Sequence, residues 1–171
     1  MGAMAMGLFA SLIIGLIISQ LAKLPGLGIL SRVTGVLASD SPVIGSAIGV
    51  AIAYGLKSDG LVIFSCAACG AAGYMSGGPV GAYIGSVIGA EAGQLVSKKT
   101  PFDIIVTPSA AIICGGLAAS YVGPYISAAM TWLGNIVNSA TEMAPLPMGI
   151  IVGAVVGMVL TLPISSAALC I

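Results

Sequence analysis

Glu91 is the side chain in this sequence whose type and position could do chemistry, because it is a carboxylate inside the apolar stretch Val80–Val96. Ionisable groups at membrane depth are costly, and they face partners or water-filled cavities. At about 100° per residue, Glu91 faces away from the glycines that lie two positions to either side of it. Two interpretations stay open. Either Glu91 lines a path for a substrate or a proton, with Gln94 one turn later, or it lies near the end of its span and reaches the interface near Lys98.

Prolines in or beside apolar stretches mark a second group of candidates. Discontinuous helices expose backbone amides and carbonyls that bind ions or polar solutes at mid-membrane, and paired breaks point to a transporter site. The sequence around Pro108 loosely resembles that around Pro163, and the hydroxyls that follow, of Ser109, Ser165 and Ser166, could donate to a polar ligand. The alternative is that each proline only kinks a packed helix. The prolines concerned are Pro79, Pro108, Pro124 and Pro163.

The other reactive side chains do not suggest an enzyme. Cys66 and Cys69 have a Cys-x-x-Cys spacing, but a structural zinc site needs four ligands, and the chain has no histidine and no second such pair. Two small sulfur side chains one helical turn apart are more typical of packing. The absence of histidine removes the usual general base, and neither a phosphate-binding loop nor a nucleophile elbow is present. We therefore expect no catalytic residue, no metal and no cofactor.

The composition sets the environment of these residues. Of the 171 residues, 58% are hydrophobic and 6% are charged, so the chain cannot cover the surface of a soluble domain with charge. High hydrophobicity excludes disorder, and five basic against five acidic residues leave no basic face for nucleic acid. The sequence therefore predicts a multi-pass membrane protein.

Apolar segments divide the chain into candidate membrane spans, each needing roughly 20 mainly apolar residues. We expect an all-α, polytopic helix bundle with about five or six spans, some of them discontinuous. Leu24–Asp40 is expected to be an interfacial or re-entrant piece, and Thr131–Pro147 an amphipathic segment at the interface. The candidate spans are Met4–Ala22, Ser41–Leu56, Leu61–Met75, Val80–Val96, Ile104–Met130 and Met148–Ile171.

Glycines at every fourth position are expected to hold the bundle together. Small residues let helices approach closely in lipid, where apolar burial does not drive association, so a glycine stripe indicates a packing seam. The same stripe could also serve as a sliding surface during transport. The main ladder is Gly73, Gly77, Gly81, Gly85, Gly89 and Gly93, and shorter ones are Gly45–Gly49 and Gly149, Gly153 and Gly157.

The basic residues give a weak prediction of topology. If all six segments cross, Lys57, Lys98 and Lys99 share one side of the membrane and Lys23 and Arg32 share the other. The positive-inside rule then places the Lys98–Lys99 loop in the cytoplasm.

Several runs of residues resemble one family. They are Gly78–Gly85, Gly89–Lys99, Asp103–Pro108, Met130–Gly134 and Leu160–Ala168. Together they resemble the EIIC-type membrane subunit of the bacterial phosphotransferase system, in its perfringolysin-regulator-like branch. The resemblance covers most of residues 60–171 and is thinner before them.

The resemblance implies a multi-pass protein of the bacterial inner membrane that moves a small, sugar-like solute. It also implies separate IIA and IIB partners that carry phosphate. Family members are roughly twice this length, so residues 1–171 are expected to form a single transmembrane domain that is a fragment or half of a longer chain. The glycine surfaces also suggest a homodimer. The alternative function is a membrane-embedded regulator or sensor without transport activity.

Overall fold

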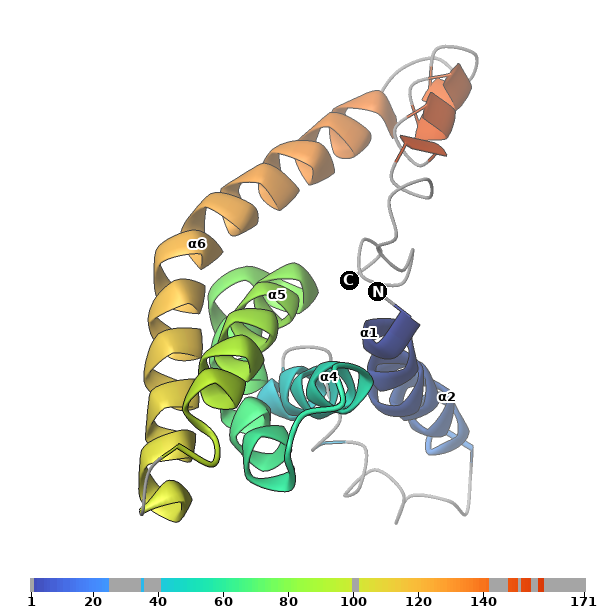
Figure 1. Ribbon diagram of the computed structural model, residues 1–171. Coiled ribbons are helices and arrows are strands. Elements are labelled where there is room, and N and C mark those ends of the chain that lie inside the picture. The colour runs from blue at the N-terminus through green and yellow to red at the C-terminus, as the bar shows by residue number, and fades with distance from the viewer. Residues whose placement is uncertain are drawn as a thin grey trace.

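The computed structural model describes residues 2–24, 35, 41–99 and 102–141, together with 148–150, 152–154 and 157–158. Throughout these residues the regular structure is helical (Figure 1), which confirms the expected all-α fold. Among the described residues, three helical segments are long and apolar enough to cross a membrane: Gly2–Leu21, Gly60–Val96 and Asp103–Ile136. Most of the predicted interfacial piece Leu24–Asp40, and most of the predicted span Met148–Ile171, lie outside the described residues.

The first predicted span is one helical rod with an irregular turn inside it. It consists of α1 (Gly2–Leu8), a π-helical turn (Phe9–Ile13) and α2 (Ile14–Leu21), close to the predicted Met4–Ala22. In the irregular turn the Ser11 hydroxyl donates to the carbonyl of Gly7, at 2.7 Å. The buried hydroxyl of Ser11 is therefore paired within the rod itself.

Helix α4 (Pro42–Gly55) begins where the sequence predicts it to begin. Pro42 is preorganised for the first helical turn, and the Ser41 side chain accepts a hydrogen bond from the Val43 amide at 3.3 Å. Two apolar ridges with a spacing of four residues then pack together: Ile44, Ile48 and Ile52 on α4, and Met4, Leu8 and Leu12 on the first rod.

Helix α5 (Gly60–Val96) is not one rod but two arms folded back on each other. Gly77 has φ −150° and ψ 25°, and Gly78 has φ 61° and ψ −152°, a conformation that only glycine adopts readily. Pro79 then starts the second arm with a fixed φ. This confirms the break predicted at Gly-Gly-Pro, and we call the folded pair, residues 60–96, the hairpin.

Contacts along the whole length of the hairpin show that its arms are antiparallel. Near the tip, a Cβ added to Gly73 would lie 2.8 Å from the Cα of Ala82. In the middle, the Cys66 thiol lies 3.8 Å from the Ser86 carbonyl. At the base, Val62 packs against Gly93, so each arm of about 25 Å returns the chain to the level at which it started.

Helix α6 (Asp103–Thr141) is longer than predicted. It runs without interruption through Pro108 and Pro124, so the expected boundary between the span Ile104–Met130 and a separate interfacial segment is absent. Its 39 residues extend about 58 Å, nearly twice the hydrocarbon thickness of a bilayer. The helix bends along its length (Figure 1). A proline removes one helical hydrogen bond and kinks a helix more readily than it ends a long one.

Close contacts surround the glycines of the main ladder. A Cβ added to Gly81 would meet the first arm of the hairpin, one added to Gly77 would meet Gly123 of α6, and one added to Gly93 would meet both Val62 of the first arm and Ala111 of α6. Gly85 and Gly89 face both the first arm and α6. In contrast, Gly149, Gly153 and Gly157 have open space around them among the described residues, so this part of the structure gives the second ladder no packing role.

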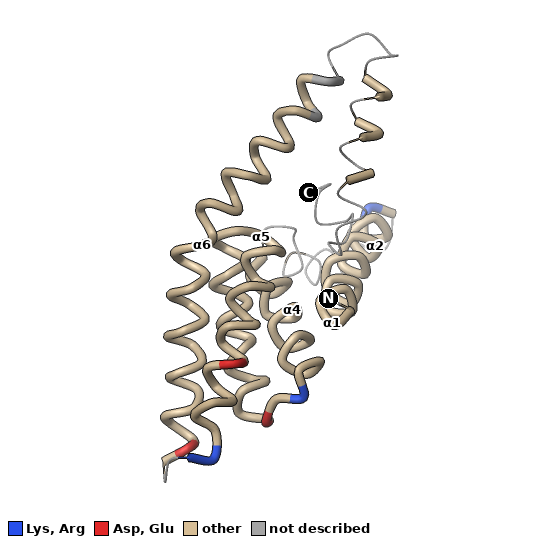
Figure 2. The backbone as a smooth tube through the Cα atoms, turned by 45° about the horizontal axis from the view of Figure 1, so that its top comes forward, with Lys and Arg blue, Asp and Glu red and all other residues tan. Residues whose placement is uncertain are grey.

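Charged residues collect at one end of the bundle (Figure 2). Lys98 at the end of the hairpin forms an ion pair with Asp59 at its start, with 2.7 Å between Nζ and Oδ1. Lys57 lies in the connection between α4 and the hairpin, and Asp103 begins α6. The first rod starts beside the end of α4, where a Cβ on Gly55 would lie 2.6 Å from the Ala3 Cβ, so Lys23 follows the far end of that rod. The predicted grouping of Lys57 with the Lys98–Lys99 loop, opposite Lys23, therefore agrees with the fold.

Candidate functional site

Polar side chains tie the base of the hairpin together. The Gln94 amide donates to the Ser58 hydroxyl at 2.7 Å, and the Ser97 hydroxyl donates to Oδ2 of Asp59 at 2.7 Å. Lys98 donates to the other carboxylate oxygen of Asp59. These hydrogen bonds hold the pKa of Asp59 below its ordinary value and raise that of Lys98. The base is therefore a fixed, internally paired cluster.

Glu91 is close to this cluster but is not part of it. It lies six residues before Ser97, about 9 Å further along the second arm. Its side chain is exposed, and it has no hydrogen bond or ion pair with any other residue that the structure describes. Lys98 pairs with Asp59 instead, so the carboxylate of Glu91 is free to meet a group that comes from outside these helices.

The surroundings of Glu91 are apolar. Ile88 and Leu95 are exposed one turn before and one turn after it, so all three side chains share the outer face of the second arm. The predicted direction of Glu91, away from the glycine seam, is therefore correct. A carboxylate within an apolar outer face needs water, a partner helix or a polar ligand near it.

Gln94 does not accompany Glu91 on that face. Because its amide donates to Ser58, it points toward the loop that precedes the hairpin. Sequence spacing places Gln94 one turn after Glu91. It cannot show that Ser58, 36 positions before Gln94, accepts the hydrogen bond of the Gln94 amide.

The tip of the hairpin packs against the part of α6 that contains Pro124. A Cβ added to Gly77 would lie 3.0 Å from the Cα of Gly123, the residue before Pro124. Pro124 has no amide hydrogen, so the Ser120 carbonyl one turn earlier loses its usual helical donor. The tip therefore lies beside Gly123–Pro124, where α6 stays helical. The expected pairing of the break at Pro108 with that at Pro163 stays a prediction, because Pro163 lies outside the described residues.

The region around Pro108 gives less support to a site. The helix is continuous there, and the Ser109 hydroxyl donates to the Ile105 carbonyl at 2.7 Å. The Thr107 hydroxyl donates to Asp103, whose carboxylate also accepts from the Lys98 amide. Pro108 thus lies in a packed, capped helix start. Pro163, Ser165 and Ser166 lie outside the described residues.

The two cysteines pack at the centre of the bundle. The Cys69 thiol lies 3.3 Å from the Ala111 carbonyl of α6, and the Cys66 thiol faces the second arm. No group of three or more metal-binding side chains occurs within the part of the chain that the structure describes. Sequence reasoning did not single out Ser86, whose buried hydroxyl has no hydrogen-bond partner among the described residues. Sequence spacing does not indicate this residue, because it cannot show that the Ser86 hydroxyl points toward Gly49 of α4.

Apolar helices of membrane-spanning length, joined by close glycine contacts and with a folded-back hairpin among them, are typical of an integral membrane protein. The chain belongs to the family "Phosphotransferase system, EIIC", whose family model matches residues 1–171. No curated protein and no solved structure matches the chain. The family supports membrane-embedded sugar transport that works with IIA and IIB components.

Proposed function

We propose that this chain is the permease subunit that moves a small, sugar-like solute across the bacterial inner membrane. In this proposal the IIA and IIB subunits supply the phosphate, because the chain itself has no histidine to carry it. We also propose the perfringolysin-regulator-like branch, a multi-pass arrangement and a homodimer, none of which the family match alone specifies.

The observation that carries the proposal is the unpaired Glu91 on the second arm. Carboxylates recognise hydroxyl groups well because they accept strong, charge-assisted hydrogen bonds. Glu91 lies about 9 Å inward from the charged end of the hairpin, where a solute that enters from that end would reach it. The break at the hairpin tip, Gly77–Pro79 against Gly123, supplies backbone polar groups at the other end.

The first test is a thermal-shift screen of the purified, detergent-solubilised protein against sugars, sugar alcohols and small anions. A ligand at a hundredfold excess over its Kd stabilises the folded state by about 2.7 kcal/mol. We expect one solute class to raise the melting temperature of the parent but not that of Glu91→Gln. Leu95→Gln is the matched control, because it adds the same amide one turn away and keeps the carboxylate.

Uptake into proteoliposomes that also hold the phosphate-carrying subunits then distinguishes transport from sensing. Loss of uptake in Glu91→Gln, with normal membrane insertion, supports the permease. Normal uptake by that variant would show that Glu91 is not part of the transport pathway. Selective binding without any uptake favours the regulator or sensor instead, a function for which the part of α6 beyond Gly123, with Trp132 exposed, offers a contact surface.

A further inference from the structure

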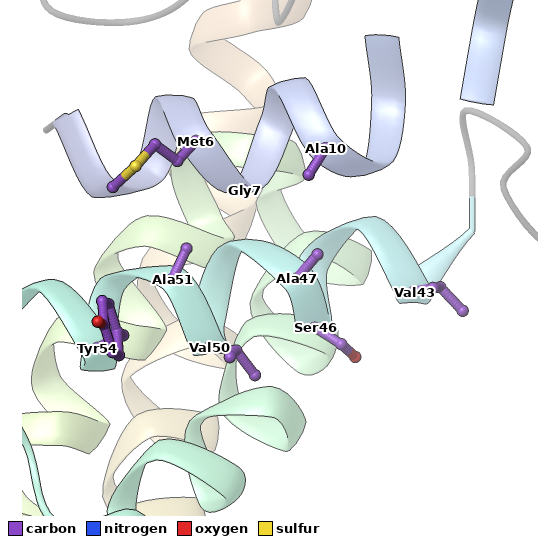
Figure 3. A pocket seen from close by; sticks show the side chains of 9 residues that line it. All are labelled: Met6, Gly7, Ala10, Val43, Ser46, Ala47, Val50, Ala51 and Tyr54. Carbon is purple, nitrogen blue, oxygen red and sulfur yellow. The ribbon is translucent and has the colours of Figure 1, made fainter. Parts of the chain in front are cut away.

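An apolar groove runs along the outside of the bundle between the first rod and α4 (Figure 3). Its volume is about 530 Å³. Tyr54 lies at one end of it and Val43 at the other, and both side chains are exposed. Met6, Gly7 and Ala10 line it from the rod, and Val43, Ser46, Ala47, Val50, Ala51 and Tyr54 line it from α4.

The length and position of the groove match one leaflet of a bilayer. Val43 and Tyr54 are eleven positions apart, which corresponds to about 16 Å along a helix. Half of a hydrocarbon core is about 15 Å thick. The Tyr54 end lies at the charged end of the bundle, where α4 leads into the loop that holds Lys57 and Asp59. With the charged end of the bundle placed at the membrane surface, a groove of this length extends to about the bilayer midplane.

The chemistry of the two ends differs in the way that a phospholipid would require. The groove is apolar along its length, as an acyl chain needs, and Tyr54 is 69% exposed at its mouth, where tyrosine is favoured at the membrane–water interface. Lys57 follows one turn later, is exposed, and forms no ion pair with any described residue. A cation in that position attracts the phosphate of an anionic lipid.

The floor of the groove argues against a second copy of the chain as its occupant. Helices associate in membranes where small residues let their backbones approach. Here Gly7 is already in use, because a Cβ added to it would lie 2.9 Å from the Ala47 carbonyl oxygen and 3.1 Å from the Ala51 Cβ. The small residues thus bring the rod and α4 together, and the larger Met6, Val50 and Tyr54 remain at the rim.

We propose that this groove binds one acyl chain of an anionic phospholipid, with its headgroup phosphate at Lys57 beside the Tyr54 hydroxyl. The site is separate from Glu91, so lipid binding does not depend on the transport proposal. Its physical role is to fill the apolar space between the rod and α4 and to fix the rod against α4.

Native mass spectrometry of the detergent-solubilised chain, titrated with phosphatidylglycerol or phosphatidylcholine, tests the site. We expect one phosphatidylglycerol to remain bound, and Lys57→Gln to weaken its binding about fivefold, the effect of one lysine near an anionic headgroup. Val50→Trp, which fills the groove, should remove the bound lipid. Lys99→Gln and Ile113→Trp are the matched controls, at the same end of the molecule and on an exposed face of α6.

Three results would overturn the proposal. Equal binding of the two lipids would show that the headgroup makes no specific contact. Unchanged lipid binding in both Lys57→Gln and Val50→Trp would show that the lipid does not bind in the groove. A dimer that Val50→Trp abolishes, while lipid binding persists, assigns the groove to a second copy instead. Lys57→Gln lies in an exposed turn, so it keeps the test valid should the tryptophan variant fail to fold.

Discussion

Gly73 and Gly81 lie opposite each other across the hairpin, so closely that a Cβ on either one would meet backbone atoms of the other. An added Cβ on Gly81 would lie 3.3 Å from the Gly73 carbonyl carbon, and one on Gly73 would lie 2.7 Å from that of Gly81. Backbone cannot move aside as a side chain can. The absence of a side chain at both positions therefore lets the two arms approach closely enough for the chain to fold back within the few residues around Gly78.

Alanine at Gly73 or Gly81 should push the two arms apart near the tip. We expect each variant to lose about 1–3 kcal/mol of unfolding free energy, the usual cost of overpacking. Thermal unfolding in detergent, followed by circular dichroism, measures the loss. Gly60→Ala is the control, since an added Cβ there meets no neighbour. A Gly81→Ala protein as stable as the parent would contradict the close approach.

Gly115 and Gly116 are adjacent on α6 but should respond oppositely to alanine. A Cβ on Gly115 would lie 2.7 Å from the Gly85 carbonyl oxygen and 2.8 Å from the Cys69 sulfur, whereas one on Gly116 meets nothing. Gly115→Ala should therefore destabilise the protein, and Gly116→Ala should be neutral or stabilise it by up to about 1 kcal/mol, the helix propensity difference. Melting temperatures measured side by side decide the point. Equal shifts in the same direction would mean that α6 does not pack through Gly115.

The ion pair at the hairpin base should make stability depend on pH. Hydrogen bonds from Lys98 and then from Ser97 lower the pKa of Asp59, so its contribution is present above the carboxyl's ordinary pKa of 3.8. That contribution is lost as the pH falls through the lowered value. Lys98 has a raised pKa, so its share is lost only at strongly alkaline pH. Asp59→Asn should be less stable than the parent at pH 7.

Unfolding temperatures between pH 7 and pH 3 measure this effect. The gap between the parent and Asp59→Asn should narrow as the carboxyl of the parent becomes protonated. Lys99→Gln, the neighbouring exposed lysine, should follow the parent at every pH. A gap that stays constant down to pH 3 would show that the Asp59 charge contributes nothing.

Cys66 and Cys69 should be unreactive in the folded protein. Both are fully buried, and their thiols face carbonyls of the second arm and α6. In a background with Cys114→Ser and Cys170→Ser, a maleimide should label neither thiol until the protein unfolds. Lys99→Cys in the same background supplies a reactive thiol in the exposed loop. Labelling before unfolding, at the rate of that control, would mean that the hairpin and α6 separate readily.

The sequence was most informative where one physical requirement dominates. A stripe of glycines has few uses in a membrane besides close packing, so Gly85 and Gly89 could be assigned to a seam. Gly77-Gly78-Pro79 combines a glycine-only conformation with a good helix start, and a break could be predicted there. Ser41-Pro42 marked the start of α4 for the same kind of reason.

Partners across the bundle could not be predicted, because they depend on tertiary contacts. The same ladder contacts the first arm at Gly81 and α6 at Gly77, and nothing in the repeat distinguishes these positions. Gln94 was grouped with Glu91 by spacing, yet Ser58 binds it. At Pro124 the alternative that the proline sits in a continuous helix is the one observed, since the neighbouring hydrogen bonds carry α6 through it.

The hairpin also has a consequence for how the chain is inserted during synthesis. The second arm has glycine at every fourth position and the first arm has Gly70, Gly73 and Gly77 toward the tip, so the tip half of the hairpin lacks the continuous bulky apolar surface that lets a lone segment leave the translocon for lipid. Paired through Gly73 and Gly81, the arms cover each other's exposed backbone and enter as one unit. The two arms are therefore expected to integrate together, and damage at Gly78 should appear first as failed biogenesis rather than as a slower permease.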